Sequence, residues 1–369
     1  MRADSAPEAP PLPIVRAVTA VTGLLGKVRR ALTPPPLRLL ELTSISYFVS
    51  NAVLAAVKLG VPEAMRGGPR TPDELAAAVG ADPAALKRLL RALASVGVLA
   101  TAAGGRFDLT PTSRLLLGDT PGSMLPLLRF AGAEWHHRVW GGLAECVRSG
   151  KPAAEQVLGA PLFEYLAQHP ADNDVFNAAM RSFSAQVAAA LLGAYDLSSA
   201  RKLVDVGGGH GQLVSLALAR HPGLRGAVFD LPHVVEGARE VLRAAGVEAR
   251  ADLVGGDFFK GDDLPKGADV YTLMNIVHDW SDEDSVRILE ACRAAMGPGS
   301  RLLLVEMVIP EGDTPHFATL FDLEMLVLFG GGRERTEEEL RALCGRAGLR
   351  VERVMPTASP SSIVEARLP

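Results

Sequence analysis

The sequence predicts an α/β protein: a mostly parallel sheet with an antiparallel C-terminal edge, preceded by a mainly helical N-terminal region. Three observations support this. From Arg201 onward, apolar strand-like runs alternate with helical runs, which is typical of a parallel sheet covered by helices. A glycine-rich turn follows the first of these strands. Before them lie two short helices and a hairpin pattern. The 369 residues suffice for about two domains.

Residues 1–36 are rich in alanine and proline and end in three consecutive prolines. We predict a separate N-terminal tail here, because the prolines interrupt regular structure. Within it, Val15–Leu32 is either a short amphipathic helix that packs on a partner or a poorly ordered segment.

The segment 37–117 has the pattern of a winged helix. Its predicted helices are Leu37–Val57, Glu74–Val79 and Pro83–Val96. Thr71 and Asp82 are predicted N-caps, each followed by a proline at the first helical position. A strand, a Gly-Gly turn and a second strand come after the last helix.

A winged helix serves either DNA binding or association between chains. The second helix of the pair carries only Lys87, Arg88 and Arg91 as basic residues, which is a poor footprint for DNA. The net charge of −4 and the 5% aromatic content also disfavour nucleic acid and anionic membranes as partners. No uncharged apolar run reaches the roughly 20 residues of a spanning helix. We expect association between chains, with a DNA-binding regulator as the alternative.

Residues 118–195 form a predicted helical connector that holds much of the aromatic content, including Trp140 and Phe176. Such residues commonly serve helix–helix packing. They can also form the wall of a pocket for an aromatic molecule, and both interpretations stay open.

Residues 196–369 form the predicted α/β domain. Strand-like runs cover residues 202–208, 226–231, 249–259, 268–277 and 301–309, and helical runs cover 211–221, 234–245, 282–296 and 337–347. Two final runs, 349–356 and 361–368, are predicted as an antiparallel edge pair.

The turn after the first strand contains Gly207, Gly209 and Gly211. Glycines at this place let a nucleotide approach the backbone closely. Their G-x-G-x-G spacing favours S-adenosylmethionine over a dinucleotide, whose turn reads G-x-G-x-x-G. Asp230 ends the next strand, where an acid can bind both ribose hydroxyls.

Asp257 follows the third strand, where it can accept a hydrogen bond from an adenine amine, with Phe258 against the ring. The alternative for Asp257 is a loop cap. Its register with Asp230 favours ligand contact, because ligands bind at the carboxyl ends of parallel strands.

His278 is the strongest catalytic candidate. It falls where a buried strand ends, in the run MNIVHDWSDED, and Ser281 and Asp284 cap the helix that follows. A buried, hydrogen-bonded histidine is the alternative. Its position at the functional edge of the sheet favours a general base.

The segments LVDVGGGHG, FDLPHVV, GDFF, HDWSDED, VEMVIPE and GGGRERTEEEL resemble those of S-adenosylmethionine-dependent small-molecule O-methyltransferases. That family includes plant caffeate-type, animal acetylserotonin-type and bacterial antibiotic-tailoring enzymes. The resemblance covers nearly the whole chain and implies a Rossmann-like catalytic domain and a homodimer formed through the winged-helix-like region. Plant-type members often have lysine four residues before the catalytic histidine, whereas this chain has Met274.

The resemblance also implies roles for individual residues. His278 would be the general base, with Glu306 and Glu334 as its orienting acids. The cofactor contacts would be Gly207, Gly209, Asp230, Leu231, Asp257 and Phe258. The acceptor pocket would be lined by Trp140, Phe176, Met180, Met325 and Phe329. Without the resemblance, Glu334 would be interpreted as a surface charge between Arg333 and Arg335.

The implied reaction is methylation of a phenolic hydroxyl on a small aromatic secondary metabolite, with S-adenosylhomocysteine as product. It needs no metal, because the sulfonium already activates the methyl carbon. The same fold could instead carry out C- or N-methylation or a non-methylating reaction. Three dispersed cysteines and an acidic, proline-containing N-terminus predict a cytoplasmic protein.

Overall fold

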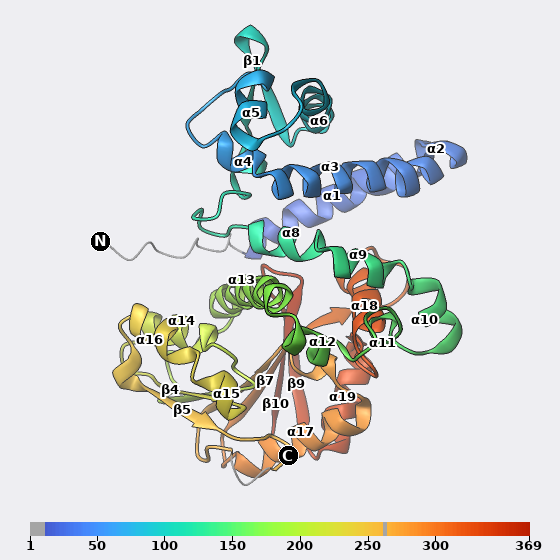
Figure 1. Cartoon of the computed structure of the whole chain (residues 1–369). Helices are drawn as coiled ribbons and strands as arrows, with labels where there is room; N and C mark the ends of the chain where they lie inside the picture. Colours follow the sequence, from blue (N-terminus) through green and yellow to red (C-terminus); the bar gives the residue numbers. More distant parts are fainter. Residues whose placement is uncertain (1–11, 261–263) are drawn as a thin grey trace. The chain divides into compact units, whose positions relative to one another are not determined.

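The computed structural model describes residues 12–260 and 264–369 (Figure 1). The chain divides into two compact units. One contains Pro13–His137 and His169–Ser182, and the other contains Arg138–Gln168 and Phe183–Pro369. The predicted domain boundaries at residues 36, 117 and 195 remain predictions.

The N-terminal unit begins with helices that run almost without interruption. They are α1 (Leu12–Leu32), α2 (Pro35–Leu40), the π-helix η1 (Glu41–Ile45) and α3 (Ser46–Leu59). Of the two interpretations of Val15–Leu32, the structure has the helix. Arg29 of α1 lies 2.7 Å from Glu41 of η1, so an ion pair joins these two helices. Residues 1–11 of the predicted tail lie outside the described residues.

The helix from Pro35 to Leu59 is apolar enough, with a mean hydropathy of 1.4, to cross a membrane by length and composition alone. Only 11% of that window is buried, and Leu42, Ile45, Tyr47 and Phe48 are exposed. A helix that presents large apolar side chains in this way is typical of a surface that another protein covers.

The winged-helix pattern is confirmed. After α4 (Val61–Ala64), the elements are α5 (Pro72–Val79), α6 (Pro83–Ser95), β1 (Leu99–Ala102), β2 (Arg106–Leu109) and α7 (Pro111–Arg114). Thr71 and Glu74 form a reciprocal capping box on α5, and Asp82 caps α6, as the sequence predicted. Leu75, Leu90 and Phe107 pack in the small core beneath.

The predicted connector, residues 118–195, consists mainly of helices. It comprises α8 (Leu125–Ala131), α9 (Glu134–Trp140), α10 (Leu143–Ser149), α11 (Ala153–Leu158), α12 (Leu162–Gln168) and α13 (Pro170–Ala194).

The main sheet has the strand order β5-β4-β3-β6-β7-β10-β9. Its strands are β3 (Lys202–Val206), β4 (Arg225–Asp230), β5 (Ala251–Gly255), β6 (Val270–Met274), β7 (Arg301–Ile309), β9 (Arg350–Pro356) and β10 (Ser361–Arg367), and the short β8 (Arg335–Thr336) pairs with β7. The first five are parallel, whereas β10 is antiparallel to both β7 and β9. The predicted fold class, including its antiparallel edge, is confirmed.

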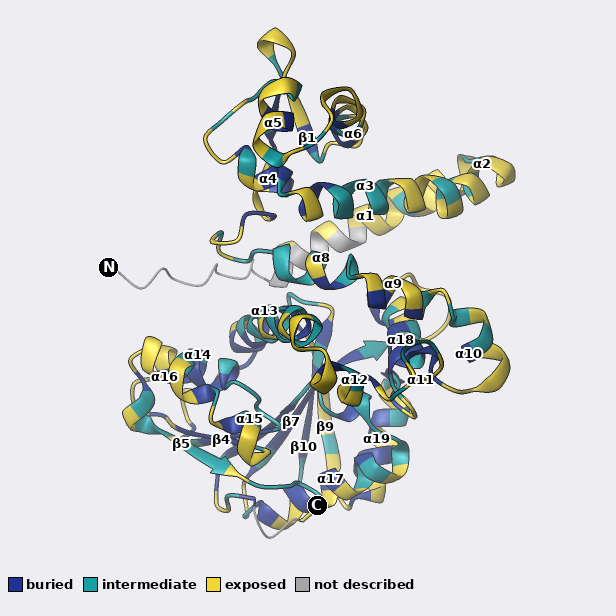
Figure 2. Ribbon diagram, in the orientation of Figure 1, coloured by how far each residue is buried: buried dark blue, intermediate teal, exposed yellow. Residues whose placement is uncertain are grey.

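The central strands of this sheet are largely buried, whereas β5 and β9 at its edges are partly exposed. Helices cover both faces of the sheet (Figure 2). They are α14 (Gln212–Arg220), α15 (Pro232–Val235), α16 (Ala238–Ala244), α17 (Asp282–Ala295), α18 (Phe317–Leu328) and α19 (Glu337–Arg346). The single helix predicted over residues 234–245 is wrong, because the chain forms α15 and α16 with Gly237 between them. A Cβ at Gly237 would lie 2.7 Å from the ring of His210, so the glycine lets that turn approach.

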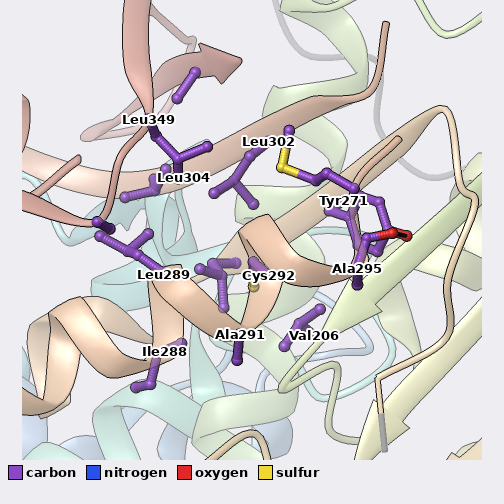
Figure 3. Packing of buried hydrophobic residues seen from close by; sticks show 14 of the residues in the cluster. Val206, Tyr271, Ile288, Leu289, Ala291, Cys292, Ala295, Leu302, Leu304 and Leu349 are labelled. Atoms are coloured by element: carbon purple, nitrogen blue, oxygen red, sulfur yellow. Dashed lines mark hydrogen bonds between the residues drawn. The ribbon is translucent and has the colours of Figure 1, made fainter. Parts of the chain in front are cut away.

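One of the two sheet cores is formed between α17, α19 and the strands. Figure 3 shows Leu289 and Cys292 of α17 in one cluster with Leu302 and Leu304 of β7. Each fully buried leucine contributes roughly 1.5–3 kcal/mol of transfer free energy. Such packing holds the carboxyl ends of β6 and β7 in fixed positions, and these ends carry the candidate site.

Candidate active site

The carboxyl ends of β6 and β7 bring together residues that are far apart in the sequence. His278 lies in a short 3-10 helix, Val277–Asp279, just after β6. Glu306 lies on β7, and Glu334 directly precedes β8. All three side chains are buried: His278 is 7% exposed, and Glu306 and Glu334 are each 2% exposed.

These side chains form one cluster around the imidazole. His278 Nδ1 lies 2.9 Å from Glu334 Oε1 and 3.5 Å from Glu306 Oε2. On the other side of the ring, Nε2 lies 3.5 Å from Asp279 Oδ1. The backbone N–H groups of Ile276 and Val277 donate to Glu306 Oε1 at 3.1 and 2.8 Å. Glu334 is thus the hydrogen-bond partner of Nδ1, and Glu306 also fixes the loop.

The carboxylates change the protonation of the histidine. Burial lowers the pKa of His278, but Asp279, Glu306 and Glu334 outweigh burial and raise it to about 10. Burial raises the pKa of Glu306 to about 7 despite the nearby imidazole, and it also raises the pKa of Asp279. We assign the imidazolium–carboxylate pair to His278 and Glu334, because they share the shorter, hydrogen-bonded contact.

A clamp formed by Arg333 and Arg335 holds this geometry. The Arg333 backbone N–H donates to the carbonyl oxygen of His278 at 2.8 Å. The buried Arg335 guanidinium donates to the carbonyl oxygens of Val277 and Trp280, each at 2.8 Å. The two residues that flank Glu334 therefore bind the loop that carries the imidazole. Contrary to the surface-charge alternative, Glu334 is buried between them.

The glycine-rich turn lies beside this cluster. Gly207 has φ +71°, and a Cβ there would lie 2.5 Å from the side chain of Ile276. Only glycine fits this position without displacement. The Gly209 N–H donates to Asp230 Oδ2 at 2.8 Å, which joins the turn to the end of β4. The close approach at Gly207 is therefore to Ile276, whereas a Cβ at Gly209 would meet nothing within 4 Å, so the backbone there is open to a ligand.

The predicted cofactor residues continue along the same edge, since β4 and β5 are the next strands in the sheet. Burial raises the pKa of Asp230. Leu231 is exposed, at 44%. Asp257 accepts a hydrogen bond from the N–H two residues on, at 2.9 Å, as a loop cap would, and Phe258 packs edge-on against Trp280. A glycine turn, two carboxylates that accept hydrogen bonds and apolar side chains together fit a nucleoside.

The predicted acceptor residues are only partly brought together. Met325 is buried on α18, one turn after Phe321, whose ring centroid lies 6.5 Å from that of His278. Phe329 follows the same helix and packs on Phe163 at 5.7 Å. Trp140 Nε1 donates to Glu324 of α18 at 2.5 Å. These residues all belong to the catalytic unit.

Phe176 and Met180 belong to the other compact unit. There the Phe176 ring packs edge-on against Phe130, at 5.9 Å, which is the helix-packing interpretation of that residue. Their part in the acceptor pocket stays a prediction.

Sequence reasoning missed Asp279 and Phe321 as members of the site. Asp279 directly follows His278, and its proximity to Nε2 comes from the tight 3-10 turn. Phe321 lies four residues before Met325, a spacing that places both on one helix face. That spacing was a usable signal.

Two family models match the sequence. One, described as an O-methyltransferase domain, matches residues 140–350, and the other, described as an O-methyltransferase dimerisation domain, matches residues 41–119. The chain belongs to the O-methyltransferase family. This O-methyltransferase is therefore an enzyme, and the winged-helix region coincides with the part of the family that is named for dimerisation.

Relatives of this O-methyltransferase match over most of their length. The phenazine O-methyltransferase PhzM of Lysobacter antibioticus is 43% identical over 87% of this chain and 93% of the relative. The mitomycin biosynthesis 6-O-methyltransferase of Streptomyces lavendulae is 43% identical over 86% and 90%. The structure of human N-acetylserotonin methyltransferase in complex with SAM has a TM-score of 0.82 and 30% identity, covering 91% of this chain and 99% of that one.

Some relatives of this O-methyltransferase are named for other chemistry. One is an 8-amino-8-demethylriboflavin N,N-dimethyltransferase of Streptomyces davaonensis, 36% identical over 86% of this chain and 92% of the relative. Another is the aclacinomycin 10-hydroxylase RdmB of Streptomyces purpurascens, 38% identical over 81% and 80%. Membership of the family therefore does not establish which chemical group is modified. That group has to be argued from the site.

Proposed function

We propose that this enzyme methylates a phenolic hydroxyl on a small aromatic secondary metabolite, with His278 as the general base. The observation that carries the proposal is the buried imidazole whose Nδ1 is hydrogen-bonded to Glu334 at 2.9 Å, at the sheet edge that also holds the glycine-rich turn. A nucleophile that must lose a proton requires such a group, because a phenol with a pKa near 10 is mostly protonated at neutral pH.

The methyl donor is S-adenosylmethionine, which supplies a methyl group already activated by a sulfonium. The turn containing Gly207 and Gly209 would hold its amino-acid part, and Asp230 its ribose. Leu231, Asp257 and Phe258 would surround the adenine. The chain's own task is then to hold the acceptor in line with the methyl group and to take up a proton.

Proton transfer would go to Nε2 of His278. Nδ1 keeps its proton and donates it in a hydrogen bond to Glu334. The neutral imidazole is therefore the tautomer whose Nε2 carries a free lone pair. The pKa of His278, about 10, is close to that of a phenol, so transfer from the bound acceptor costs little free energy. The same high pKa means that the imidazole is mostly protonated at pH 7, and turnover should therefore increase as the pH rises.

An aromatic acceptor fits the residues near the imidazole. Phe321, Met325 and Phe329 provide apolar surface along and just beyond α18, and Trp140 extends it. The family resemblance assigns Phe176 and Met180 to acceptor binding as well, and their part remains a prediction. The names of the relatives, which act on phenazines and mitomycins, support a fused-ring acceptor.

We also propose that the enzyme acts as a cytoplasmic homodimer. The exposed apolar side chains of η1 and α3 lie within the region that matches the dimerisation model, which supports this part of the chain as the interface. The three cysteines are buried and free, as suits a reducing compartment.

N-methylation is the second candidate, because a relative is named for it. An amine attacks with its own lone pair and needs no base beforehand, whereas a phenol does. The imidazole–carboxylate cluster therefore favours the hydroxyl.

Isotope-labelled S-adenosylmethionine with a panel of hydroxy- and amino-substituted naphthalenes and phenazines tests the proposal. We expect label on oxygen, located by mass spectrometry, and at least a 100-fold lower rate in His278→Gln with unchanged affinity for S-adenosylhomocysteine. The rate should survive dialysis against EDTA, although His278, Glu306 and Glu334 place three ligand atoms within 4.8 Å of one another. Label on nitrogen or carbon, or full activity of His278→Gln, would contradict the proposal.

A further inference from the structure

Helix α1 carries a stripe of large apolar side chains that the described residues leave exposed. The stripe recurs at alternating steps of four and three residues. Its members are Ile14, Val18, Val21, Leu25, Val28 and Leu32. Their exposed fractions run from 48% at Val28 to 78% at Leu32. The other described residues of α1 are almost all exposed too (Figure 2), so this helix contributes little to the core of its own unit.

The spacing of the stripe is that of a coiled coil. Alternating steps of four and three residues are the a and d positions of a heptad repeat, in which side chains of one helix insert between those of another. A helix that packs on a globular core has a broader apolar arc than this narrow seam. The six side chains cover nearly three heptads. The seam of α1 therefore has the shape that a second helix fits.

The helix also needs such a partner in order to stay helical. A single helix of 21 residues is only marginally stable in water. Gly23 and Gly26 lie inside α1, and glycine disfavours the helix more than any residue except proline. Neither glycine belongs to the seam. Packing along the seam would supply the stabilisation that the sequence of α1 lacks.

The place of α1 in the chain indicates which partner is available. Arg29 of α1 pairs with Glu41, which is the first residue of the match to the dimerisation domain. Tyr47 and Phe48, both exposed, follow within that match. The seam is thus continuous with the surface that we propose as the dimer interface. Because α1 ends at Leu32, before the match begins, the family model of that interface does not include it.

We infer that α1 pairs with α1 of a second copy of this chain as an antiparallel coiled coil and so extends the dimer interface. The inference rests on the proposed homodimer. The charged residues of α1 are all basic, and Lys27, Arg29 and Arg30 lie close to its C-terminal end. A parallel pair would bring these cations of both chains together, whereas an antiparallel pair separates them and opposes the two helix dipoles.

The seam is complementary to itself in this arrangement. A two-fold axis at the level of Gly23, the midpoint of the stripe, sets each a position against a d position of the other chain. The facing pairs are then Ile14 with the partner's Leu32, Val18 with the partner's Val28, and Val21 with the partner's Leu25. All six side chains find a counterpart, as a two-fold interface requires.

Single cysteines in the full-length enzyme, treated with a short bis-maleimide, test the pairing and its direction. Leu24 flanks the seam and would lie within about 3 Å of its counterpart along the helix axis, whereas Leu32 would lie about 27 Å from its own. We expect Leu24→Cys to give a covalent dimer on a denaturing gel and Leu32→Cys to stay uncross-linked. The wild type is the baseline, because Cys146, Cys292 and Cys344 are buried. The reverse pattern, or no cross-link in either variant, would overturn the inference.

Sedimentation equilibrium measures what the seam contributes. Leu25→Glu places a charge in the seam and should raise the Kd of the dimer at least about tenfold. Lys27→Glu is the matched control, because it introduces the same residue on the same helix outside the seam, and its Kd should stay within about twofold of the wild type. An equal change in both variants would contradict a specific seam.

Two results would assign the seam elsewhere. Flotation with vesicles of phosphatidylserine and phosphatidylcholine should leave the wild type unbound, and binding that Leu25→Glu abolishes would overturn the inference in favour of a lipid surface. Cross-linking of Leu24→Cys only within species larger than a dimer would place the pairing outside the dimer.

Failure of the inference is distinguishable from failure of the proposed homodimer. A wild type that sediments as a monomer at micromolar concentration would refute both. A wild-type dimer whose Kd is unchanged by Leu25→Glu would refute the pairing of α1 alone. Methyl transfer is measured separately, so its absence would leave the pairing of α1 intact.

Discussion

Replacing Glu334 with glutamine should lower the pH at which the enzyme becomes active. The carboxylate of Glu334 is one of three that raise the pKa of His278 from 6.5 to about 10. Glutamine has the same shape and can still accept the Nδ1 proton, so Glu334→Gln removes the charge with little change in packing. The neutral imidazole, which is the base, then forms at lower pH.

The size of the effect follows from the cluster. A rise from 6.5 to about 10 corresponds to roughly 5 kcal/mol in favour of the imidazolium. Asp279 and Glu306 supply part of it, and Glu334 contributes through both a hydrogen bond and its charge. One adjacent opposite charge is worth about 1–3 pH units. We therefore expect the midpoint of the pH–rate profile to fall by roughly 2 units, and the plateau rate to fall at least about tenfold because the imidazolium is less stabilised.

The assay is kcat/KM against pH from 6 to 10.5 for the wild type and Glu334→Gln, with two acceptors whose hydroxyl pKa values differ. Glu306→Gln is the matched control: its Oε1 can keep both backbone hydrogen bonds, and it has no hydrogen bond to the ring, so its midpoint should shift less. The reasoning fails if the midpoint follows the pKa of the acceptor or stays in place in Glu334→Gln.

Three further outcomes are expected. Asp230→Ala should weaken S-adenosylhomocysteine binding at least about tenfold in calorimetry, and unchanged affinity would remove Asp230 from the ribose site. Because folded His278 keeps its proton up to about pH 10 and the unfolded chain loses it near 6.5, the free energy of unfolding should fall as pH rises through this window. Urea titrations at pH 6 and 9 should show a smaller fall for His278→Gln. Phe48→Glu, at a side chain that is 65% exposed, should give a monomer in sedimentation velocity with an unchanged circular dichroism spectrum.

The elements that local sequence determines could be predicted. Thr71, Asp82 and Ser281 cap the helices expected of them, and the apolar runs became the strands of the sheet. Local sequence could not show the π-helical turn at Glu41–Ile45, because that turn accommodates one extra residue within an otherwise continuous helix.

The site was predictable in its members more than in its geometry. The family motifs indicated His278, Glu306 and Glu334, but a pairing over 56 residues depends on β7, β8 and the Arg335 clamp. Nothing in the local sequence of Asn275 required its positive φ of +56°. The three carboxylates that raise the pKa of His278 against the effect of burial likewise come together only in the assembled sheet.

The residues that hold the general base, which are the clamp residues Arg333 and Arg335, differ from the residues that are expected to bind the acceptor. Helix α18 lines the expected acceptor wall, whereas the segment after it fixes the base through hydrogen bonds to the backbone of the His278 loop. On α18, Asp322 also supports this segment, because its Oδ1 accepts a hydrogen bond from the Glu334 N–H at 2.8 Å. An engineer could therefore vary Phe321 and Met325 to admit new acceptors and keep the base intact. A single-residue insertion between α18 and the clamp would do the opposite, since it would move Glu334 out of register with the imidazole.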